Sequence, residues 1–378
     1  MKKMLSVVMA AALAMSLTAC GSSGSGSTAS TTAAAAADTT AADTAAASTA
    51  ADTAAATVAG DATAAAGDTT AADTAAATAE TVAVTGKMTM GTGGTSGTYY
   101  AFGGVLSQYI KNYGGIDVTV VSTDGSKADI QGIEVGDYQL GTVQSDVMAY
   151  AWTGTKSFEG EPVTNFRVIG GLYAETVQLV TMDPEIKSPA DLAGKAVSIG
   201  APGSGVYFNA MDVLASADLT EDDIKAQYLS FADSAEGLKD GKIDAAFIVA
   251  GAPTPAITEL MTTNDAYLVP IEGEYADKIM AECPYYTELA IPAGTYPKQD
   301  ADVMTLTVKA TLIVSADASE DDVYNITKAV YENADAIATE HSKGAELSLD
   351  NATTGMTAPF HAGAAKYYAE QGITVENE

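Results

Sequence analysis

Apolar and polar positions along the chain predict strands and helices in alternation. Short apolar runs such as KMTM at 87–90 and IDVTVVS at 116–122 have the length and the residue types of strands. Between them, apolar residues recur at spacings of three and four from Phe102 to Ile110, which predicts a helix with one buried face. This alternation is typical of α/β folds, in which helices cover parallel sheets.

The same arrangement occurs a second time further along the chain. The glycine-rich loop GTGGTSGTYY at 91–100 leads into the first helix, and APGSGVYF at 201–208 leads into another. GIEVGDYQLGTVQSD at 132–146 has a counterpart in GLKDGKIDAAFIVAG at 237–251, at nearly the same offset. The repeat predicts two lobes of similar build, joined by hinges near 173–177 and 284–291.

Ligands of open α/β sheets bind beyond the carboxyl ends of the strands. Two such lobes would therefore place loop 91–97 opposite loop 202–205 across a cleft. Loop 142–146 would face loop 249–254 in the same cleft.

The first 84 residues differ in character from the rest. Lys2 and Lys3 followed by an apolar run at 5–17 predict a secretory signal, and LTAC resembles the lipobox in which Cys20 is acylated. Residues 21–84 consist almost wholly of Ala, Thr, Ser, Gly and Asp and contain no aromatic residue, which predicts a disordered tether. We expect an extracytoplasmic protein held at the membrane by its lipid alone.

Charge and composition exclude several classes of function. The net charge is −31, and after removal of residues 1–84 the chain retains 16 basic and 42 acidic residues, a net charge of −26. Such a surface repels nucleic acid and anionic lipid. Beyond Cys20 the chain has one cysteine, Cys283, and its two histidines are 20 residues apart, at His341 and His361. A metal cluster or a Ser-His-Asp triad is therefore poorly supported, and we expect no cofactor.

The glycine loops allow three interpretations. Gly91, Gly93 and Gly97 approximate a dinucleotide fingerprint, with Asp124 where a ribose-binding acid would lie. An exported protein has little access to such cofactors, and one cofactor does not require two loops. Backbone N–H groups and helix N-termini would hold a carboxylate equally well, or the loops only cap their helices.

Several other side chains are candidates for ligand contacts or for the core. Tyr99 and Tyr207 stand at helix starts beside the predicted cleft, and Gln144 and Ser145 follow a strand. Asp146 is expected to cap the next helix. Whether Arg167, the only arginine, contacts a ligand stays open.

Longer motifs carry a family resemblance. GTGGTSGTYYAFGGVLSQ, GLYAETVQLV with DLAGKAVSIGAPGSG, GLKDGKIDAAFIVAGAPTPAI, IPAGTYPKQDADVMTL and TGMTAPFHAGAAKYYAEQG resemble, in order, the motifs of TAXI-family solute receptors of tripartite ATP-independent periplasmic (TRAP) transporters. The resemblance spans about 85–374. The chain departs from the family where Ala101, Ala174 and Ala362 replace common prolines.

The resemblance implies a two-lobed type II periplasmic-binding-protein fold of the Venus-flytrap kind, in which each lobe is a mixed sheet flanked by helices. It also implies capture of a small carboxylate such as glutamate, glutamine or 2-oxoglutarate, and delivery to the TRAP membrane subunits. The expected divisions are a signal peptide at 1–19, a tether at 20–84, lobe I at 85–175, lobe II at 176–289 and a return to lobe I at 290–378. The residues that it carries into the ligand site are Thr95, Ser96, Gly97, Tyr99, Gln144, Ser145, Ser204, Gly205, Val206 and Tyr207.

No bond is made or broken in such a mechanism, and no catalytic residue is expected. An exported enzyme or a sensor partner on the same two-lobed fold is the alternative. The identity of the solute, the number of membranes of the host and the oligomeric state stay open.

Overall fold

The computed structural model of the chain describes residues 85–377. The predicted signal peptide, the lipidation site Cys20 and the predicted tether lie outside the described residues. Among the described helices, none is long and apolar enough to cross a membrane.

The strands form one ten-stranded sheet in the order β2-β1-β3-β10-β4-β7-β5-β6, with β8 paired to β4 and β9 paired to β10. The strands are β1 (Gly86–Gly91), β2 (Ile116–Val121), β3 (Leu140–Gln144), β4 (Phe166–Thr181), β5 (Ala196–Ser198), β6 (Lys225–Gln227), β7 (Ala245–Ala250), β8 (Tyr267–Val269), β9 (Thr287–Ile291) and β10 (Val303–Ser315).

Helices cover this sheet. The α-helices are α1 (Thr98–Tyr109), α2 (Ser126–Val135), α3 (Ser145–Thr153), α4 (Val206–Ser216), α5 (Phe231–Lys239), α6 (Pro255–Thr263), α7 (Glu274–Glu282), α8 (Glu320–Tyr331), α9 (Ala334–Glu340), α10 (Leu349–Thr353) and α11 (Ala362–Glu370). Short helices of other types are η1 (Ile110–Gly114), η2 (Lys156–Phe158), η3 (Pro189–Leu192), η4 (Glu221–Asp223) and η5 (Ser342–Glu346).

Parallel and antiparallel pairs are both present at each end of the sheet. β1 is parallel to β2 and β3, and β5 is parallel to β6 and β7. The long strands β4 and β10 are antiparallel to each other, and they connect the two parallel groups through β7 and β3. The predicted α/β class, with mixed sheets flanked by helices, is confirmed.

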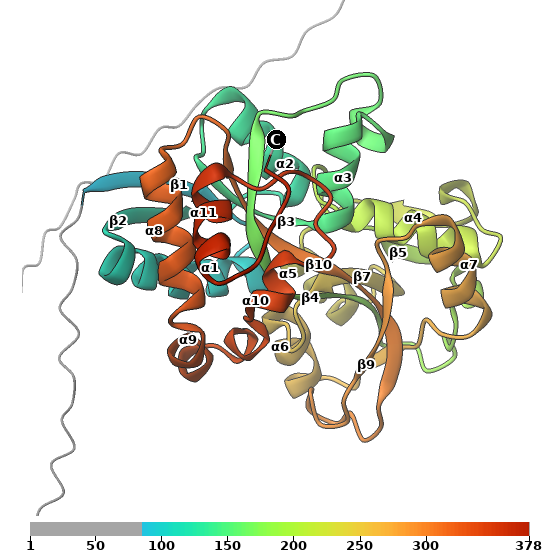
Figure 1. Ribbon diagram of the computed structural model, residues 1–378. Helices are drawn as coiled ribbons and strands as arrows, with labels where there is room; N and C mark the ends of the chain where they lie inside the picture. The colour runs from blue at the N-terminus through green and yellow to red at the C-terminus, as the bar shows by residue number, and fades with distance from the viewer. Residues whose placement is uncertain (1–84, 378) are drawn as a thin grey trace, which may run out of the picture. The chain divides into compact units, whose positions relative to one another are not determined.

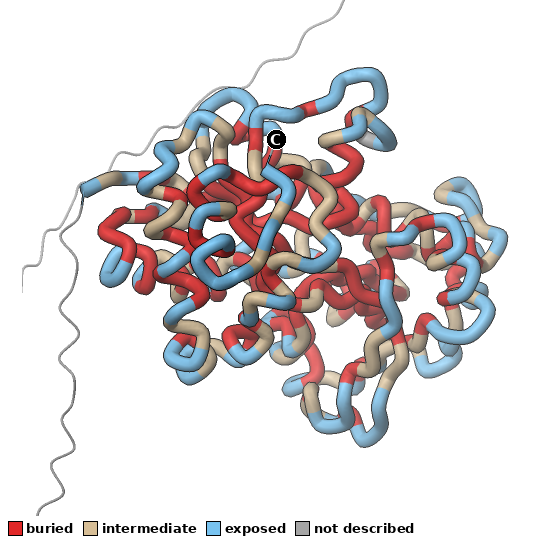
Figure 2. The backbone as a smooth tube through the Cα atoms, viewed as in Figure 1, coloured by how far each residue is buried: buried red, intermediate tan, exposed pale blue. Residues whose placement is uncertain are grey.

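The buried side chains define two lobes (Figures 1 and 2). The first lobe is built around one core cluster from residues 88–173 and 310–368, together with Phe208. The second lobe is built around two clusters from residues 177–308. In Figure 1, α1, α2, α8 and α11 lie around β1, β2 and β3, whereas α4 and α7 lie at the far end beyond β7 and β5.

The chain crosses between the lobes on the two long strands. On β4 the crossing falls between Tyr173 and Val177, and the role of this segment as a hinge stays a prediction. On β10 it falls between Val308 and Ala310, where the pairing with β4 is irregular. The expected return at residue 290 remains a prediction, and the core clusters favour a return near 309 because β9 and the first part of β10 pack with the second lobe.

Local signals in the sequence explain several element boundaries. Ser188 and Asp191 form the capping box that opens η3. The side chain of Ser319 caps α8, and its apolar positions Val323 and Ile326 are fully buried. Gly136 ends α2 in the left-handed conformation (φ 85°), which a residue without a Cβ adopts readily.

Candidate functional site

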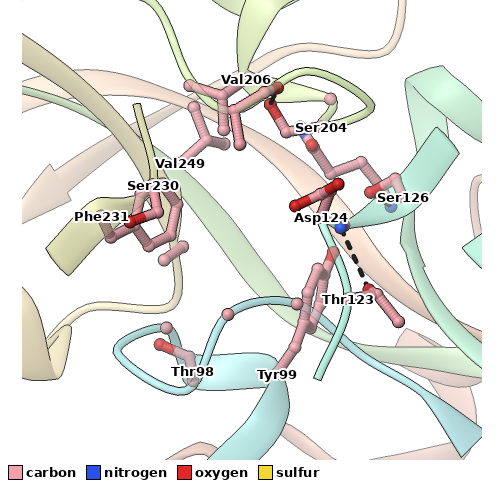
Figure 3. Close-up of a pocket in the computed structure, with 18 of the residues that line it drawn as sticks. Thr98, Tyr99, Thr123, Asp124, Ser126, Ser204, Val206, Ser230, Phe231 and Val249 are labelled. Atoms are coloured by element: carbon pink, nitrogen blue, oxygen red, sulfur yellow. Dashed lines mark hydrogen bonds between the residues drawn. The ribbon is translucent and has the colours of Figure 1, made fainter. Parts of the chain in front are cut away.

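A small cavity lies where loops of both lobes meet at the carboxyl ends of parallel strands (Figure 3). From the first lobe it is lined by the glycine loop between β1 and α1 and by the turn between β2 and α2. From the second lobe it is lined by the loop between β5 and α4 and by the end of β7. Its volume is about 70 Å³. Sites for drug-sized ligands enclose about 300–1,000 Å³, so this cavity suits a small solute and not a dinucleotide.

The cavity brings together six of the ten residues predicted for the site. From the first lobe these are Gly97, Tyr99 and Gln144, and from the second lobe Ser204, Gly205 and Val206. The opposition of the two glycine loops, expected from the internal repeat, is therefore present in the structure. In Figure 3 the Tyr99 side chain points from the start of α1 toward the turn that carries Asp124.

The other four predicted residues do not line this cavity. Thr95 is exposed, and Ser96 is half-buried, with its carbonyl oxygen accepting a hydrogen bond from the Ala256 N–H at 3.2 Å. The Ser145 hydroxyl accepts from the backbone N–H of Lys309 at 3.0 Å.

Tyr207, the second residue of α4, makes its contacts with residues outside the cavity lining. Its hydroxyl donates to Glu221 Oε2 at 3.0 Å, and its ring stacks beside Tyr228 with 6.3 Å between centroids. The roles of these four residues in ligand binding stay predictions.

Direct hydrogen bonds join the lobes at one side of the cavity. Gln144 Nε2 donates to Asn209 Oδ1 on α4 at 2.6 Å. Asn209 Nδ2 in turn lies 2.9 Å from Asp146 Oδ2 and 2.6 Å from the Tyr286 hydroxyl. The side chains of all four residues are buried, so this network holds the start of α4 against the end of β3.

Loops 142–146 and 249–254, expected to face each other, both contribute to the cavity, through Gln144 and through Val249 and Ala250, but their hydrogen bonds between the lobes have other partners. Gln144 meets the start of α4, whereas the second loop meets the start of α1, where Thr98 Oγ1 donates to the Gly251 carbonyl oxygen at 2.7 Å. The reason is steric, because Gly205 has no side chain and lets Gln144 approach. A Cβ at Gly205 would lie well inside contact distance of Gln144 Oε1.

Asp146 is not the helix cap that the sequence suggested. The N-cap of α3 is Gln144, which provides no side-chain cap, and Asp146 stands inside the first turn. Burial raises the pKa of Asp146 to about 7, although hydrogen bonds from the Val147 backbone and the Asn209 side chain oppose the shift. Burial therefore favours the protonated form of this carboxyl group to a higher pH than in a free aspartic acid.

Glu175 is a lining residue that the sequence did not assign. It lies on β4 at the crossing between the lobes, is 1% exposed, and its Oε2 has no hydrogen-bond partner among the described residues. Burial raises the pKa of this carboxyl group well above its ordinary value, and the Lys343 ammonium lowers it in part. The only sequence signal was an acidic residue inside the apolar run GLYAETVQLV.

Tyr99 shares this unusual environment. Its ring centroid lies 6.1 Å from that of Tyr173, and its buried hydroxyl also lacks a partner among the described residues. Burial raises the pKa of Tyr99, and the charge of Glu175 adds to the shift. Buried polar atoms are nearly always hydrogen-bonded, so the unpartnered oxygens of these two lining residues are candidates for contact with a ligand.

No basic side chain of the described residues lines the cavity, whereas Glu175 and Asp124 do. The guanidinium of Arg167 lies elsewhere. It donates to the carbonyl oxygens of Thr164 at 2.9 Å and Phe166 at 2.8 Å and packs over Trp152, 5.4 Å from the ring centroid. The question left open for Arg167 is thus answered against a contact in this cavity.

The histidines and the cysteine have structural partners. The Nδ1 atoms of His341 and His361 accept from the backbone N–H groups of Lys343 and Gly363 at helix starts. Cys283 is buried, with its sulfur 3.4 Å from the Tyr150 hydroxyl. Among residues 85–377 no group of three or more potential metal-ligating side chains gathers.

Comparison with known proteins adds a family. The sequence profile of the NMT1-like family matches residues 90–372. Among solved structures, the periplasmic aliphatic sulphonate binding protein SsuA of Escherichia coli is 16% identical, covers 76% of this chain and 90% of its own, and gives a TM-score of 0.40. The alkanesulfonate-binding protein SsuA of Xanthomonas axonopodis pv. citri, bound to MOPS, is 18% identical over 77% of this chain and 95% of its own, with a TM-score of 0.43. An arginine-specific periplasmic binding protein of Salmonella typhimurium is 12% identical over 68% of this chain and 99% of its own, also with a TM-score of 0.43.

Proposed function

The chain belongs to the NMT1-like family, and from this premise we propose that it is an extracytoplasmic solute-binding protein that encloses one small molecule between its lobes. The observation that carries the proposal is the cavity itself. Two glycine loops, one from each lobe, contribute to its walls, and two of its lining residues, Tyr99 and Glu175, each have a buried oxygen without a partner among the described residues. The arrangement suits capture of a molecule more than its chemical conversion.

Contacts between the lobes suggest how capture would work. Besides Gln144 with Asn209, the backbone N–H groups of Lys127 and Ala128 lie 3.1 Å and 3.2 Å from the Gly203 carbonyl oxygen. A solute that adds contacts to both walls favours the arrangement in which these hydrogen bonds form. Its differential affinity for that arrangement sets how far the equilibrium shifts.

The finer proposal is a small carboxylate as the solute. Neither α1 nor α4 has a side-chain cap at its N-terminus, where Gly97 and Gly205 stand. The first backbone N–H groups of these helices, with the positive end of the helix dipole, can therefore receive a carboxylate at the cavity. Basic side chains are not needed for such a contact.

We further propose delivery to the membrane subunits of a TRAP-type transporter, with the protein anchored by a lipid on Cys20. Both parts rest on the motifs that resemble TAXI-family receptors and on the lipobox-like LTAC. Metabolic labelling with a palmitate analogue tests the anchor, because Cys20→Ala would then abolish the label while Cys283→Ala would retain it.

A thermal-shift screen of the purified chain tests solute binding. The panel contains small carboxylates, amino acids and sulfonates at millimolar concentration. A ligand of the native state raises the melting temperature by mass action, with about 2.7 kcal/mol of added stability at one hundred times its Kd. Mass spectrometry of the recovered solute should show it unchanged. A flat response to every small solute would contradict the proposal, and a converted solute would favour the enzyme alternative.

A further inference from the structure

We propose that the cavity selects a solute that carries a protonated amine, and that Glu175 is the residue that receives this amine. The inference rests on the proposed function and goes beyond it, because it names the chemical group of the solute that Glu175 would bind. Together with a carboxylate at the helix N-termini, it describes a small zwitterion such as an amino acid.

The backbone around Glu175 fixes its side chain at the cavity. Glu175 pairs with Val308 across the β4–β10 ladder, and its carbonyl oxygen accepts a hydrogen bond from Thr307 Oγ1 at 2.9 Å. This part of β4 is where the chain crosses between the lobes, so it is tied to both cores. The carboxyl group itself is held by its near-complete burial and by a hydrogen bond from the Gly251 backbone.

Two acceptors without partners lie in this region. Glu175 Oε2 and the Tyr99 hydroxyl both belong to residues that line the cavity, and neither has a hydrogen-bond partner among the described residues. An ammonium group has three donors and no acceptor, which complements a carboxylate and a phenol oxygen. The Tyr99 ring also provides a face on which a cation is attracted.

No protein cation fills the role of this amine among the described residues. Lys343 is the nearest basic side chain to influence Glu175, but its Nζ lies 2.7 Å from Glu346 Oε1 and 5.6 Å from the centre of the Tyr173 ring. The charge of Lys343 is thus already balanced by its own acid. A buried carboxylate that lacks such a partner gains most from a ligand that brings one.

The opposite assignment would place a protonated Glu175 as a donor to an oxygen of the solute. Burial and the neighbouring charge of Glu346 do favour the protonated carboxyl group in the absence of a cation. Asp124, however, also lines the cavity, so a solute with anionic groups at both ends would meet two acids there. The geometry points to one anionic end, at the glycine loops, and one cationic end, at Glu175.

Matched pairs of probes separate the two assignments. Isothermal titration calorimetry of the full chain would compare L-glutamate with 2-oxoglutarate and 2-hydroxyglutarate, L-alanine with pyruvate, L-valine with 2-oxoisovalerate, and taurine with isethionate. Each pair differs chiefly in the amine. We expect binding within at least one pair, with the amine at least about thirtyfold tighter, since loss of one partner of a buried charge pair typically has this effect or more.

Substitution of the acid completes the test. Glu175→Gln should reduce the preference for the amine to about threefold or less, while the exposed Glu272→Gln, the same chemical change on the surface, should leave it intact. Glu175→Gln should also fold, with an unchanged or higher melting temperature without solute, because it removes a buried acid of which one oxygen has no partner among the described residues. Should it fail to fold, Tyr99→Phe gives a second reading, with an expected loss of amine affinity of about fivefold.

Two results would overturn the inference. If the members without an amine bind as tightly, or if Glu175→Gln retains the full preference, the amine site is wrong although the solute-binding function stands. If no member of any pair and no solute of the wider panel binds, the proposed function falls with it.

Discussion

Several polar side chains are buried at the interface between the lobes. Asn209 forms hydrogen bonds with both Asp146 and Tyr286, all three at full or nearly full burial, and Asp146 Oδ1 has no partner among the described residues. Such networks are favourable when every member is satisfied and costly when one is not. The protonation of one carboxyl group therefore affects the stability of the whole interface.

We expect Asp146→Asn to change the pH dependence of stability. Burial raises the pKa of Asp146 to about 7 in the folded protein from an ordinary value of 3.8, so the native state binds a proton more tightly than the unfolded state. Stability from this group is fully present below about pH 4 and is lost as the pH rises toward 7, with a slope of up to about 1.4 kcal/mol per pH unit. The asparagine variant should lack this loss.

Urea unfolding between pH 4 and 8 measures the effect as the difference between wild type and variant. The free energy of unfolding of Asp146→Asn minus that of the wild type should increase with pH up to about pH 7 and stay constant at higher pH. The exposed Asp222→Asn is the matched control and should run parallel to the wild type. Parallel curves for Asp146→Asn as well would show that this carboxyl group has an ordinary pKa.

At the scale of elements, the repeated unit is a strand, a glycine loop and a helix start. Sequence pattern predicted both units, because apolar runs, glycines and helical spacing are local properties of the chain. It also predicted that Gly97 and Gly205 would face the same cavity. Both loops follow the carboxyl ends of parallel strands, where ligands of such sheets bind, and this topological rule can be applied to a single sequence.

The parts that could not be predicted depend on distant segments. The strand at 303–315 inserts between β3 and β4, and nothing local to it specifies those neighbours. The same strand fixes the backbone of Glu175, whose role is set by its burial and by Lys343 and Glu346 far along the chain. The pairing of Gln144 with Asn209 likewise depends on the absence of a side chain at Gly205.

We expect Gly205→Ala to weaken solute binding by tenfold or more. The conformation of Gly205 (φ −75°) suits any residue, so the effect is steric. The added Cβ would collide with Gln144 and would lie 2.7 Å from Val147 Cγ2 in the first lobe. Because this contact exists only when α4 meets the end of β3, the substitution should oppose the enclosed arrangement more than it unfolds either lobe.

Gly104→Ala is the matched control for this change. A Cβ at Gly104 meets nothing within 4 Å, and the position is inside α1. Alanine there should leave the Kd unchanged and raise stability by about 0.4–1 kcal/mol through the lower entropy of the unfolded chain. Both variants would be titrated calorimetrically with the solute that binds best in the screen, and their melting curves would be recorded. A Gly205→Ala variant that binds this solute as tightly as the wild type would refute the steric argument.

At the scale of the whole molecule, the dominant feature is negative charge. Residues beyond 84 carry a net charge of −26. Two of their acids, Glu175 and Asp124, line the cavity, and no basic side chain of the described residues lines it. A surface of this kind repels anions at long range. It therefore favours a zwitterionic solute over a dianionic one at low ionic strength, which agrees with an amine as the second recognised group.

The same charge predicts how stability responds to salt. Self-repulsion acts over a Debye length of about 30 Å at 0.01 M ionic strength and about 3 Å at 1 M, so sodium chloride should raise the melting temperature across this range. Screening also weakens attractive pairs, but exposed ones such as Lys242–Asp240 and Lys298–Asp265 are worth about 0–1 kcal/mol each, and the partly buried Lys343–Glu346 pair is screened less. Repulsion should therefore dominate. Melting curves measured in sodium, potassium and choline chloride test this. The three salts should give the same increase if screening is the cause, and a melting temperature that falls with added salt would contradict the prediction.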